Sequence, residues 1–325
     1  VGMTEVRTLC EERMIWFIVI FLLILLFFLA ELLIFIGVFY SPFKSQGNIH
    51  RVPKGEQYRY REDYVWQITE ELAARTFEKA EIASFDGLTL FARCYEQNKK
   101  APVMLCFHGY RATSIRDFCG GGKTILEAGF NLILADQRAC GKSSGHTITF
   151  GVKEQYDCLA WIDYANSRFP GCDIILYGVS MGASTVLLAG AHDLPENVRG
   201  IIADCPFSSP EKIIRKVSRD IGFPPGIFYP LVRLSARIFG DFDPSSENVT
   251  DKISKIKVPV MLIHGSEDLF VPCQMSVELK KAGKTAELYI FPHAGHALSY
   301  LKDSKKYSML IKEFSEKVCK NHKTE

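Results

Sequence analysis

The chain has 325 residues, and its 39 Lys and Arg nearly balance 37 Asp and Glu, which leaves a formal net charge of +2. This length suggests one large domain or two small ones with a sizeable core, and the small charge argues against nucleic acid as the main partner. Ten cysteines are scattered singly with no CxxC pair. Their spacing predicts neither a zinc site nor a disulfide framework, and reduced thiols favour a cytoplasmic setting.

The N-terminal part is strongly apolar. After a tail over 1–13, residues 14–30 form an unbroken apolar run, and the run resumes after Glu31 to end at residue 40. This is too long for a signal-peptide core, so a single transmembrane anchor is predicted over 14–40. We expect Glu31 to lie near one membrane interface as a solvated helix residue.

The basic residues that flank this run predict its orientation. Arg7 and Arg13 precede the run, whereas more basic residues follow it: Lys44, Arg51, Lys54 and Arg59. Because the more basic flank stays inside, the large C-terminal part is expected on the cytoplasmic side of the membrane.

A polar linker over 41–63 leads into a predicted domain over 64–325, which begins with a short helix over 64–77. Asp86-Gly87 predicts a hairpin turn between strands 80–83 and 88–95. Apolar strands then alternate with helical segments. The strands are 103–107, 131–135, 174–177, 200–203, 258–263 and 286–291; the helices are near 122–128, 152–167, 181–191, from 272, and 298–318. This alternation predicts an α/β fold with a mostly parallel central sheet and helices on both faces. Residues 208–249 break the alternation and predict a helical cap.

The motif around which the domain is organised is Gly178-Val179-Ser180-Met181-Gly182. It follows an apolar strand and opens an alanine-rich helix, which is the strand–turn–helix context of a nucleophile elbow. Glycines two positions before and after the serine allow the tight turn that exposes its hydroxyl. A second match over 141–145, with Ser143 at its centre, precedes no helix. We therefore predict Ser180 as nucleophile and Ser143 as a loop residue.

A serine nucleophile needs an imidazole base that a carboxylate orients. In this strand–helix pattern the acid and then the histidine follow the serine, each after a strand. The motif His264-Gly265-Ser266-Glu267-Asp268 follows strand 258–263 and offers Asp268, with Glu267 as runner-up and Asp204 as a weaker third choice. His296 follows strand 286–291 and is preferred over His293 because Gly295 allows a sharp turn, whereas His264 is expected to be structural.

Two backbone N–H groups are needed to stabilise an oxyanion. Met181 at the helix N-terminus offers one. Tyr110, in the His108-Gly109-Tyr110 loop after strand 103–107, offers the other.

The chain resembles α/β-hydrolases of the prolyl-oligopeptidase and serine-aminopeptidase kind, particularly the small membrane-anchored members, over residues 80–317. The resemblance rests on His108-Gly109-Tyr110, Asp136-Gln137-Arg138, the Ser180 elbow, His264-Gly265-x-x-Asp268-x-x-Val271-Pro272 and Gly295-His296. The loop after Asp136 departs from the usual Arg-Gly-His-Gly, but it braces the site and leaves the triad intact. The resemblance implies an α/β-hydrolase fold and hydrolysis of an acyl bond.

The predicted function is that of a membrane-anchored serine hydrolase that cleaves an acyl ester, thioester or amide and requires no metal or organic cofactor. Alternatives are an aminopeptidase-like peptidase and a non-catalytic membrane scaffold. Apolar cap residues, with Phe223, Phe228 and Tyr229 among them, are candidates for an acyl pocket. We expect a small acyl substrate of the lipid-derived kind, with medium or longer acyl chains preferred over acetyl.

Overall fold

The computed structural model describes residues 2–41 and 61–319. Eight strands form one sheet in the order β1-β2-β4-β3-β5-β6-β7-β8. Their bounds are β1 Glu78–Ala83, β2 Thr89–Tyr95, β3 Val103–Phe107, β4 Asn131–Asp136, β5 Ile174–Val179, β6 Val198–Asp204, β7 Val260–Gly265 and β8 Ala286–Phe291. The predicted hairpin is the antiparallel pair β1–β2, β2 also runs antiparallel to β4, and the strands from β4 to β8 are parallel. The α/β fold with a mostly parallel sheet is confirmed.

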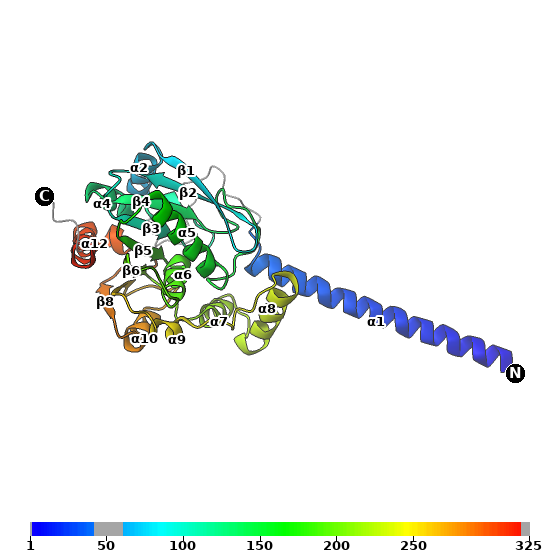
Figure 1. Ribbon diagram of the computed structural model, residues 1–325. Coiled ribbons are helices and arrows are strands. Elements are labelled where there is room, and N and C mark those ends of the chain that lie inside the picture. Colours follow the sequence, from blue (N-terminus) through cyan, green and yellow to red (C-terminus); the bar gives the residue numbers. More distant parts are fainter. Residues whose placement is uncertain (1, 42–60, 320–325) are drawn as a thin grey trace.

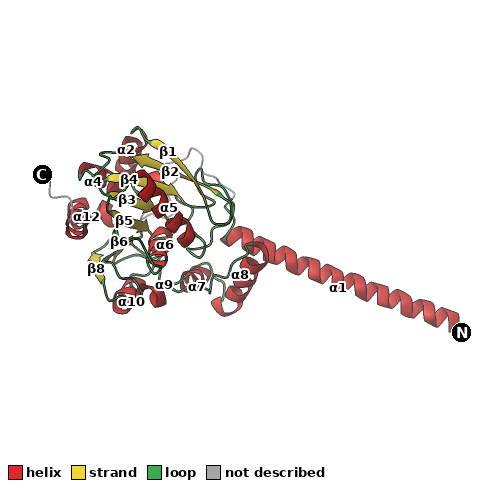
Figure 2. Ribbon diagram, viewed as in Figure 1, coloured by secondary structure: helices red, strands yellow, loops and turns green. Residues whose placement is uncertain are grey.

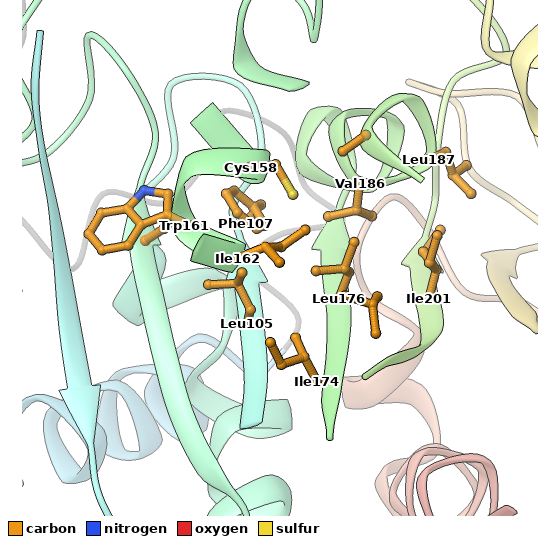
Figure 3. Packing of buried hydrophobic residues seen from close by; sticks show 14 of the residues in the cluster. Leu105, Phe107, Cys158, Trp161, Ile162, Ile174, Leu176, Val186, Leu187 and Ile201 are labelled. Carbon is orange, nitrogen blue, oxygen red and sulfur yellow. The ribbon is translucent and has the colours of Figure 1, made fainter. Parts of the chain in front are cut away.

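Helices cover both faces of the sheet (Figures 1 and 2). The first face carries α5 (Glu154–Arg168), α6 (Met181–Ala189), α9 (Val249–Ile253) and α10 (Gln274–Ala282), and the second carries α2 (Glu62–Ala73), α3 (Ser114–Asp117), α4 (Cys119–Glu127) and α12 (Ser304–Val318). Successive strand residues point to opposite faces. Leu105 and Phe107 therefore join Trp161 on the first face (Figure 3), while Met104 and Cys106 pack on the second.

The predicted C-terminal helix is interrupted once. Instead of one helix over 298–318, the chain forms α11 (Ser299–Lys302) and then α12. Asp303 lies between them, and its carboxylate accepts a hydrogen bond from the Lys306 N–H at 2.9 Å. Aspartate at this position satisfies one of the free N–H groups at a helix start, so it begins a new helix.

The break in strand–helix alternation corresponds to an insertion between β6 and β7. It holds α7 (Pro210–Asp220) and α8 (Pro225–Phe239), which form a cap, and it ends in α9. The start of α7 is fixed by the Ser209 side chain, which accepts a hydrogen bond from the Lys212 N–H at 3.0 Å, and by proline at the first helical position.

The N-terminal helix α1 (Gly2–Val38) projects away from the domain over most of its length (Figure 1). Its residues 13–38 are long and apolar enough to cross a membrane, by length and composition. The predicted linker over 41–63 lies largely outside the described residues.

The end of α1 is buried in the domain. The ring of Phe35 lies 5.8 Å from that of Phe239 on α8, and Phe39 is fully buried with its ring 5.0 Å from that of Phe242. Glu31, one turn before Phe35 on the same helix face, is only 1% exposed. The prediction that Glu31 is solvated was wrong, because the contact of α1 with the domain reaches further up the helix than its sequence indicates.

Candidate active site

Ser180 lies on a strained turn between β5 and α6. Its backbone has φ +55° and ψ −116°, a combination that few residues other than glycine adopt. A Cβ at Gly178 would lie 2.2 Å from the Gly182 carbonyl oxygen, and a Cβ at Gly182 would lie 1.9 Å from the Phe107 carbonyl oxygen. Only glycine fits at both positions, so these two residues allow the chain to turn tightly enough to present the Ser180 hydroxyl.

Three side chains form a continuous hydrogen-bonded chain at the carboxyl edge of the sheet. The Ser180 Oγ lies 2.9 Å from His296 Nε2, and His296 Nδ1 lies 2.7 Å from Asp268 Oδ2. Ser180 follows β5, Asp268 follows β7 and His296 follows β8. Because the carboxyl ends of parallel strands meet at one edge, residues that are 116 positions apart in sequence come into contact.

Asp268 is held as a carboxylate by the groups around it. Its Oδ1 accepts hydrogen bonds from the N–H groups of Phe270 and Val271 at 2.9 and 2.7 Å. Burial by itself would raise the pKa of Asp268, but the hydrogen bonds from His264 and His296 outweigh it and hold the pKa below its usual value. The ionised carboxylate therefore fixes His296 with its proton on Nδ1, which leaves Nε2 free to accept the serine proton.

The residues that the sequence offered as alternatives for the acid and the base make other contacts. His293 and Glu267 pair with each other at 2.6 Å, and both side chains are exposed. His264 is fully buried. Its Nε2 donates to the Val271 carbonyl at 2.8 Å and lies 3.2 Å from Asp268 Oδ2, and its Nδ1 accepts from the Ser276 hydroxyl at 2.6 Å, so it helps to hold Asp268 in place. Asp204 is buried behind the site and accepts a hydrogen bond from the Tyr307 hydroxyl at 2.7 Å.

The loop after β3 lies beside the Ser180 turn. A Cβ built at Gly109 would be 3.3 Å from the Ser180 Cβ, so glycine allows this close approach, and the Gly109 N–H donates to Asp117 at 2.8 Å. Tyr110 is the next residue. Met181 begins α6, where the first N–H groups have no partner within the helix and the helix dipole favours negative charge. Met181 thus directly follows the nucleophile, and the loop that carries Tyr110 approaches it; the role of their N–H groups as oxyanion donors stays a prediction.

A second buried loop braces this arrangement. His108 Nε2 accepts a hydrogen bond from the Gln137 N–H at 3.0 Å, and the Gln137 side chain donates to the His108 carbonyl. Ser143, the serine of the second Gly-x-Ser-x-Gly match, is fully buried and accepts from the Phe91 N–H at 2.9 Å. Its place in a loop agrees with the prediction.

Comparisons with known proteins agree with this architecture. The family model for the α/β-hydrolase fold matches residues 102–248, and the model of the dienelactone hydrolase family matches residues 227–320. The structure of the esterase Pf2001 from Pyrococcus furiosus superposes with a TM-score of 0.64 at 22% identity, covering 77% of this chain and 94% of that one. The chain belongs to the α/β-hydrolase superfamily.

The chain is also similar to two further bacterial proteins. Est1E from Butyrivibrio proteoclasticus, solved with ferulic acid, has a TM-score of 0.60 at 25% identity and covers 74% of this chain and 98% of its own. The uncharacterized protein YqkD of Bacillus subtilis is 31% identical over 195 residues, which is 58% of this chain and 63% of YqkD. The chain thus spans less than two thirds of that relative's length.

One group of side chains among the described residues of this α/β-hydrolase has the geometry to hold a metal ion. The ligand atoms of Cys205, Asp268 and His296 lie within 4.8 Å of one another. Burial raises the pKa of the Cys205 thiol well above its usual value, and the nearby carboxylates Asp204 and Asp268 raise it further. A protonated thiol is a poor metal ligand, and Asp268 and His296 are already paired with each other. We therefore assign the group to the hydrogen-bonded chain of Ser180.

An apolar cavity of about 440 Å³ opens beside Ser180 within the described part of the chain. Phe223 and Phe228 of the predicted acyl pocket line it, with their rings stacked 4.7 Å apart. Tyr229 does not line it, because this residue is buried on the other side of α8, where its hydroxyl lies 2.6 Å from Ser245 Oγ. Sequence reasoning had no means to tell Tyr229 from its neighbour Phe228, since adjacent residues of a helix face different directions.

Sequence reasoning also missed several cavity residues. Phe270, whose ring lies 5.1 Å from that of His296, and Ile213 and Val217 of α7 belong to the lining. The helical spacing of Ile213 and Val217 was the available signal for the α7 residues. The contribution of α1 to this cavity had no signal of its own, because all of the residues over 32–38 are apolar or glycine, whichever face of the helix they lie on.

Proposed function

We propose that the protein is a membrane-anchored serine hydrolase that cleaves acyl esters through Ser180, His296 and Asp268. The single observation that carries the proposal is the hydrogen-bonded chain from Ser180 Oγ through His296 to Asp268, with distances of 2.9 and 2.7 Å. This is the arrangement that converts a weakly nucleophilic hydroxyl into a nucleophile at neutral pH.

In the proposed mechanism, Ser180 Oγ attacks the acyl carbonyl carbon while its proton moves to His296 Nε2. The N–H groups of Tyr110 and Met181 stabilise the oxyanion of the tetrahedral intermediate. Its collapse breaks the bond to the leaving alcohol, which takes the proton from His296, and the acyl group remains on Ser180. Water then attacks the acyl-enzyme with His296 again as base, which releases the carboxylic acid and restores Ser180. Asp268 stays ionised throughout and stabilises the imidazolium of His296.

The cavity favours an ester over an N-terminal peptide as substrate. A peptidase that removes N-terminal residues needs an anionic group to hold the substrate's amino group. None of the described residues that line the cavity beside Ser180 is acidic. The likeness to the bifunctional esterase/perhydrolase DCH of Acinetobacter calcoaceticus, 22% identical over 65% of this chain and 92% of that protein, supports ester chemistry as well.

Retention of α1 as a membrane anchor is part of the proposal. A helix over 13–38 would be about 39 Å long, which exceeds the roughly 30 Å hydrocarbon core of a bilayer. Cleavage of this segment as a signal sequence would remove Phe35, which is buried in the domain, and the helix that precedes the buried Phe39. We therefore propose a single-pass protein, with the catalytic domain on the cytoplasmic side as the flanking basic residues indicate.

A fluorophosphonate probe tests the catalytic assignment. We expect the probe to label the wild-type protein but not Ser180→Ala. Labelling of His296→Ala should be too slow to measure. Ser143→Ala is the matched control, because Ser143 is central to the other Gly-x-Ser-x-Gly match and should leave labelling intact. Labelling of Ser180→Ala at the wild-type rate would refute the proposal, and so would the absence of labelling in folded wild-type protein. For the anchor, the protein should stay in the membrane after alkaline extraction, and a C-terminal tag should resist protease added to intact cells.

A further inference from the structure

Several parts of the chain line the cavity beside Ser180, and three of them are the nucleophile turn, α7 of the cap and the end of α1. The nucleophile turn closes one end with Ser180 and Met181, and α7 of the cap contributes Ile213, Ile214 and Val217. The third part is the end of α1, which contributes Leu33, Ile34, Gly37 and Val38. The same helix that is long enough to cross a membrane therefore forms one side of the candidate substrate pocket.

Hydrogen bonds and ring contacts hold the end of α1 in this position. The Arg111 guanidinium donates to the carbonyls of Gly37 and Tyr40 at 3.1 and 2.6 Å, and it thereby caps the C-terminal end of the helix. The hydroxyl of Tyr110 donates to the Val38 carbonyl at 2.7 Å. Tyr110 and Arg111 belong to the candidate oxyanion loop, so α1 is fixed directly to the catalytic machinery.

The exposed border of the cavity is also apolar and includes α1 itself. Leu33 of α1 lines the cavity and is 61% exposed, and Ile221 at the end of α7 lines it and is 62% exposed. Residues that both line a cavity and reach its outer surface mark its mouth. The mouth is therefore bordered by a side chain of the apolar helix on one side and by the cap on the other.

The cap presents a further apolar surface next to α1. Ile227, Leu234 and Ile238 of α8 are all exposed, and their spacing of seven and four residues places them on one face of that helix. The helix α8 packs against α1, as the contact between Phe35 and Phe239 shows. This exposed face continues the apolar surface of α1 onto the domain, which makes the hydrocarbon of a bilayer its best-matched partner.

The length of the apolar segment places the mouth at the membrane surface. Eighteen residues, from 13 to 30, span about 27 Å, close to the roughly 30 Å of the hydrocarbon core. Glu31 follows and is buried, and the cavity-lining part of α1 begins at Leu33. A domain fixed rigidly to this part of the helix would hold the mouth of its cavity against the bilayer.

We propose that α1 is part of the substrate-binding site, and that the substrate is a long-chain acyl ester of the bilayer whose chain enters the cavity beside α1. This inference rests on the proposed function, because it takes Ser180 as the nucleophile. An acyl chain that moves from bilayer to cavity along Leu33 stays in apolar surroundings, so its transfer involves little contact with water. The helix then acts as substrate-binding wall as well as anchor.

Gly37 allows a direct test of the α1 wall. This residue lines the cavity, and a Cβ built on it meets no atom within 4 Å. Gly37→Phe would fill part of the space that the acyl chain needs, and Gly37→Leu would fill less. Ile36→Phe is the matched control, because Ile36 lies in the same helical turn, is exposed and is absent from the lining.

The assay uses the full chain in phosphatidylcholine nanodiscs and compares kcat/KM for p-nitrophenyl laurate with that for p-nitrophenyl acetate. Each methylene that the pocket no longer buries costs about fourfold. We expect Gly37→Phe to lower the laurate-to-acetate ratio at least tenfold, Gly37→Leu to lower it less, and Ile36→Phe to leave it within twofold of wild type. An unchanged ratio in both Gly37 variants would overturn the inference, and so would an equal fall in Ile36→Phe. Fluorophosphonate labelling of each variant shows separately whether Ser180 remains active, so failure of the proposed function is distinguishable.

A second experiment tests entry from the bilayer. Ile221→Asp places a charge at the mouth, and Met309→Asp is its control, because Met309 is exposed on α12 and absent from the lining of the cavity. The probes are monooleoylglycerol in nanodiscs and monobutyrylglycerol in solution. We expect Ile221→Asp to lower turnover of the bilayer probe at least fivefold more than turnover of the soluble probe, and Met309→Asp to affect both alike. Equal effects of Ile221→Asp on the two probes would refute entry beside α1.

Discussion

Replacement of Asp268 by asparagine isolates the contribution of the orienting carboxylate with little change of shape. Asp268 Oδ1 accepts two backbone N–H groups, so the amide oxygen of the variant must take that place and its NH₂ group must take the place of Oδ2. The NH₂ group then faces His296 Nδ1 and His264 Nε2, which lie 2.7 and 3.2 Å from Oδ2 in the wild type. The NH₂ group and a protonated Nδ1 of His296 would both be donors, so His296 must carry its proton on Nε2 instead. A protonated Nε2 can no longer accept the Ser180 proton.

The wrong tautomer predicts a large and specific kinetic loss. The same substitution in serine-protease triads lowers kcat by about 10⁴, or about 5 kcal/mol of transition-state stabilisation. We expect kcat for p-nitrophenyl esters to fall by about 10³ to 10⁴ in Asp268→Asn, with KM little changed. The rate of fluorophosphonate labelling should fall in parallel, because that reaction uses the same activated hydroxyl.

The matched control for this substitution is Glu267→Gln. Glu267 is adjacent in sequence but is exposed and pairs with His293, so we expect its kcat to stay within about threefold of wild type. Thermal unfolding of both variants shows whether they are folded. A folded Asp268→Asn variant with kcat within fivefold of wild type would refute the assignment, as would an equal loss in Glu267→Gln.

Three further predictions concern acyl length, pH and the buried end of α1. We expect kcat/KM for p-nitrophenyl esters to rise from acetate to laurate by up to about fourfold per buried methylene, and a monotonic fall would indicate a small, closed pocket. Burial raises the pKa of Asp204 to about 6 from 3.8, although the hydrogen bond from Tyr307 opposes this shift. The folded state thus binds more protons than the unfolded state between these values, and the free energy of unfolding should fall by about 2 kcal/mol as pH rises from 4 to 6. Tm against pH should be flatter over this window in Asp204→Asn than in wild type, and parallel profiles would contradict the shift. Finally, Phe39→Ala should destabilise the protein by about 3 to 5 kcal/mol, because this buried ring contacts those of Phe150 and Phe242, whereas the exposed Phe28→Ala should leave Tm nearly unchanged. Equal Tm values for the two variants would show that the end of α1 is not docked.

Features that depend on local chemistry were predictable from the sequence. The Ser180 turn needs glycines at fixed spacing because backbone atoms occupy the space of a Cβ at both positions, and such a requirement leaves a visible pattern. The strand ends were readable as well, since a buried parallel strand is a continuous apolar run. Strands, elbow and cap insertion therefore follow from residues that are close together along the chain. The helix break at Asp303 was readable in principle, because aspartate is a preferred helix N-cap.

Choices between neighbouring residues of the same chemistry needed the tertiary structure. His293 and His296, or Glu267 and Asp268, offer the same groups, and the conformation of two loops decides which pair meets Ser180. His293 adopts φ +57° and points its ring to Glu267 at the surface, while His296 turns inward to Asp268. In the same way, the rotation of α8 about its axis decides that Phe228 lines the cavity and that Tyr229 does not.

The second role of α1 depended wholly on tertiary structure. Composition alone predicts an anchor, because a uniformly apolar helix looks the same whether lipid or protein surrounds each face. The packing of α8 on Phe35 and the bonds from Arg111 fix one face of the last turns of α1 against the domain, and Glu31 on that face is buried as well. These contacts join residues more than seventy positions apart, and their energy depends on complementary shapes that no periodicity in either segment records. The sequence thus determined the elbow and the sheet, whereas tertiary packing decided which acid, which histidine and which helix lie at the candidate site.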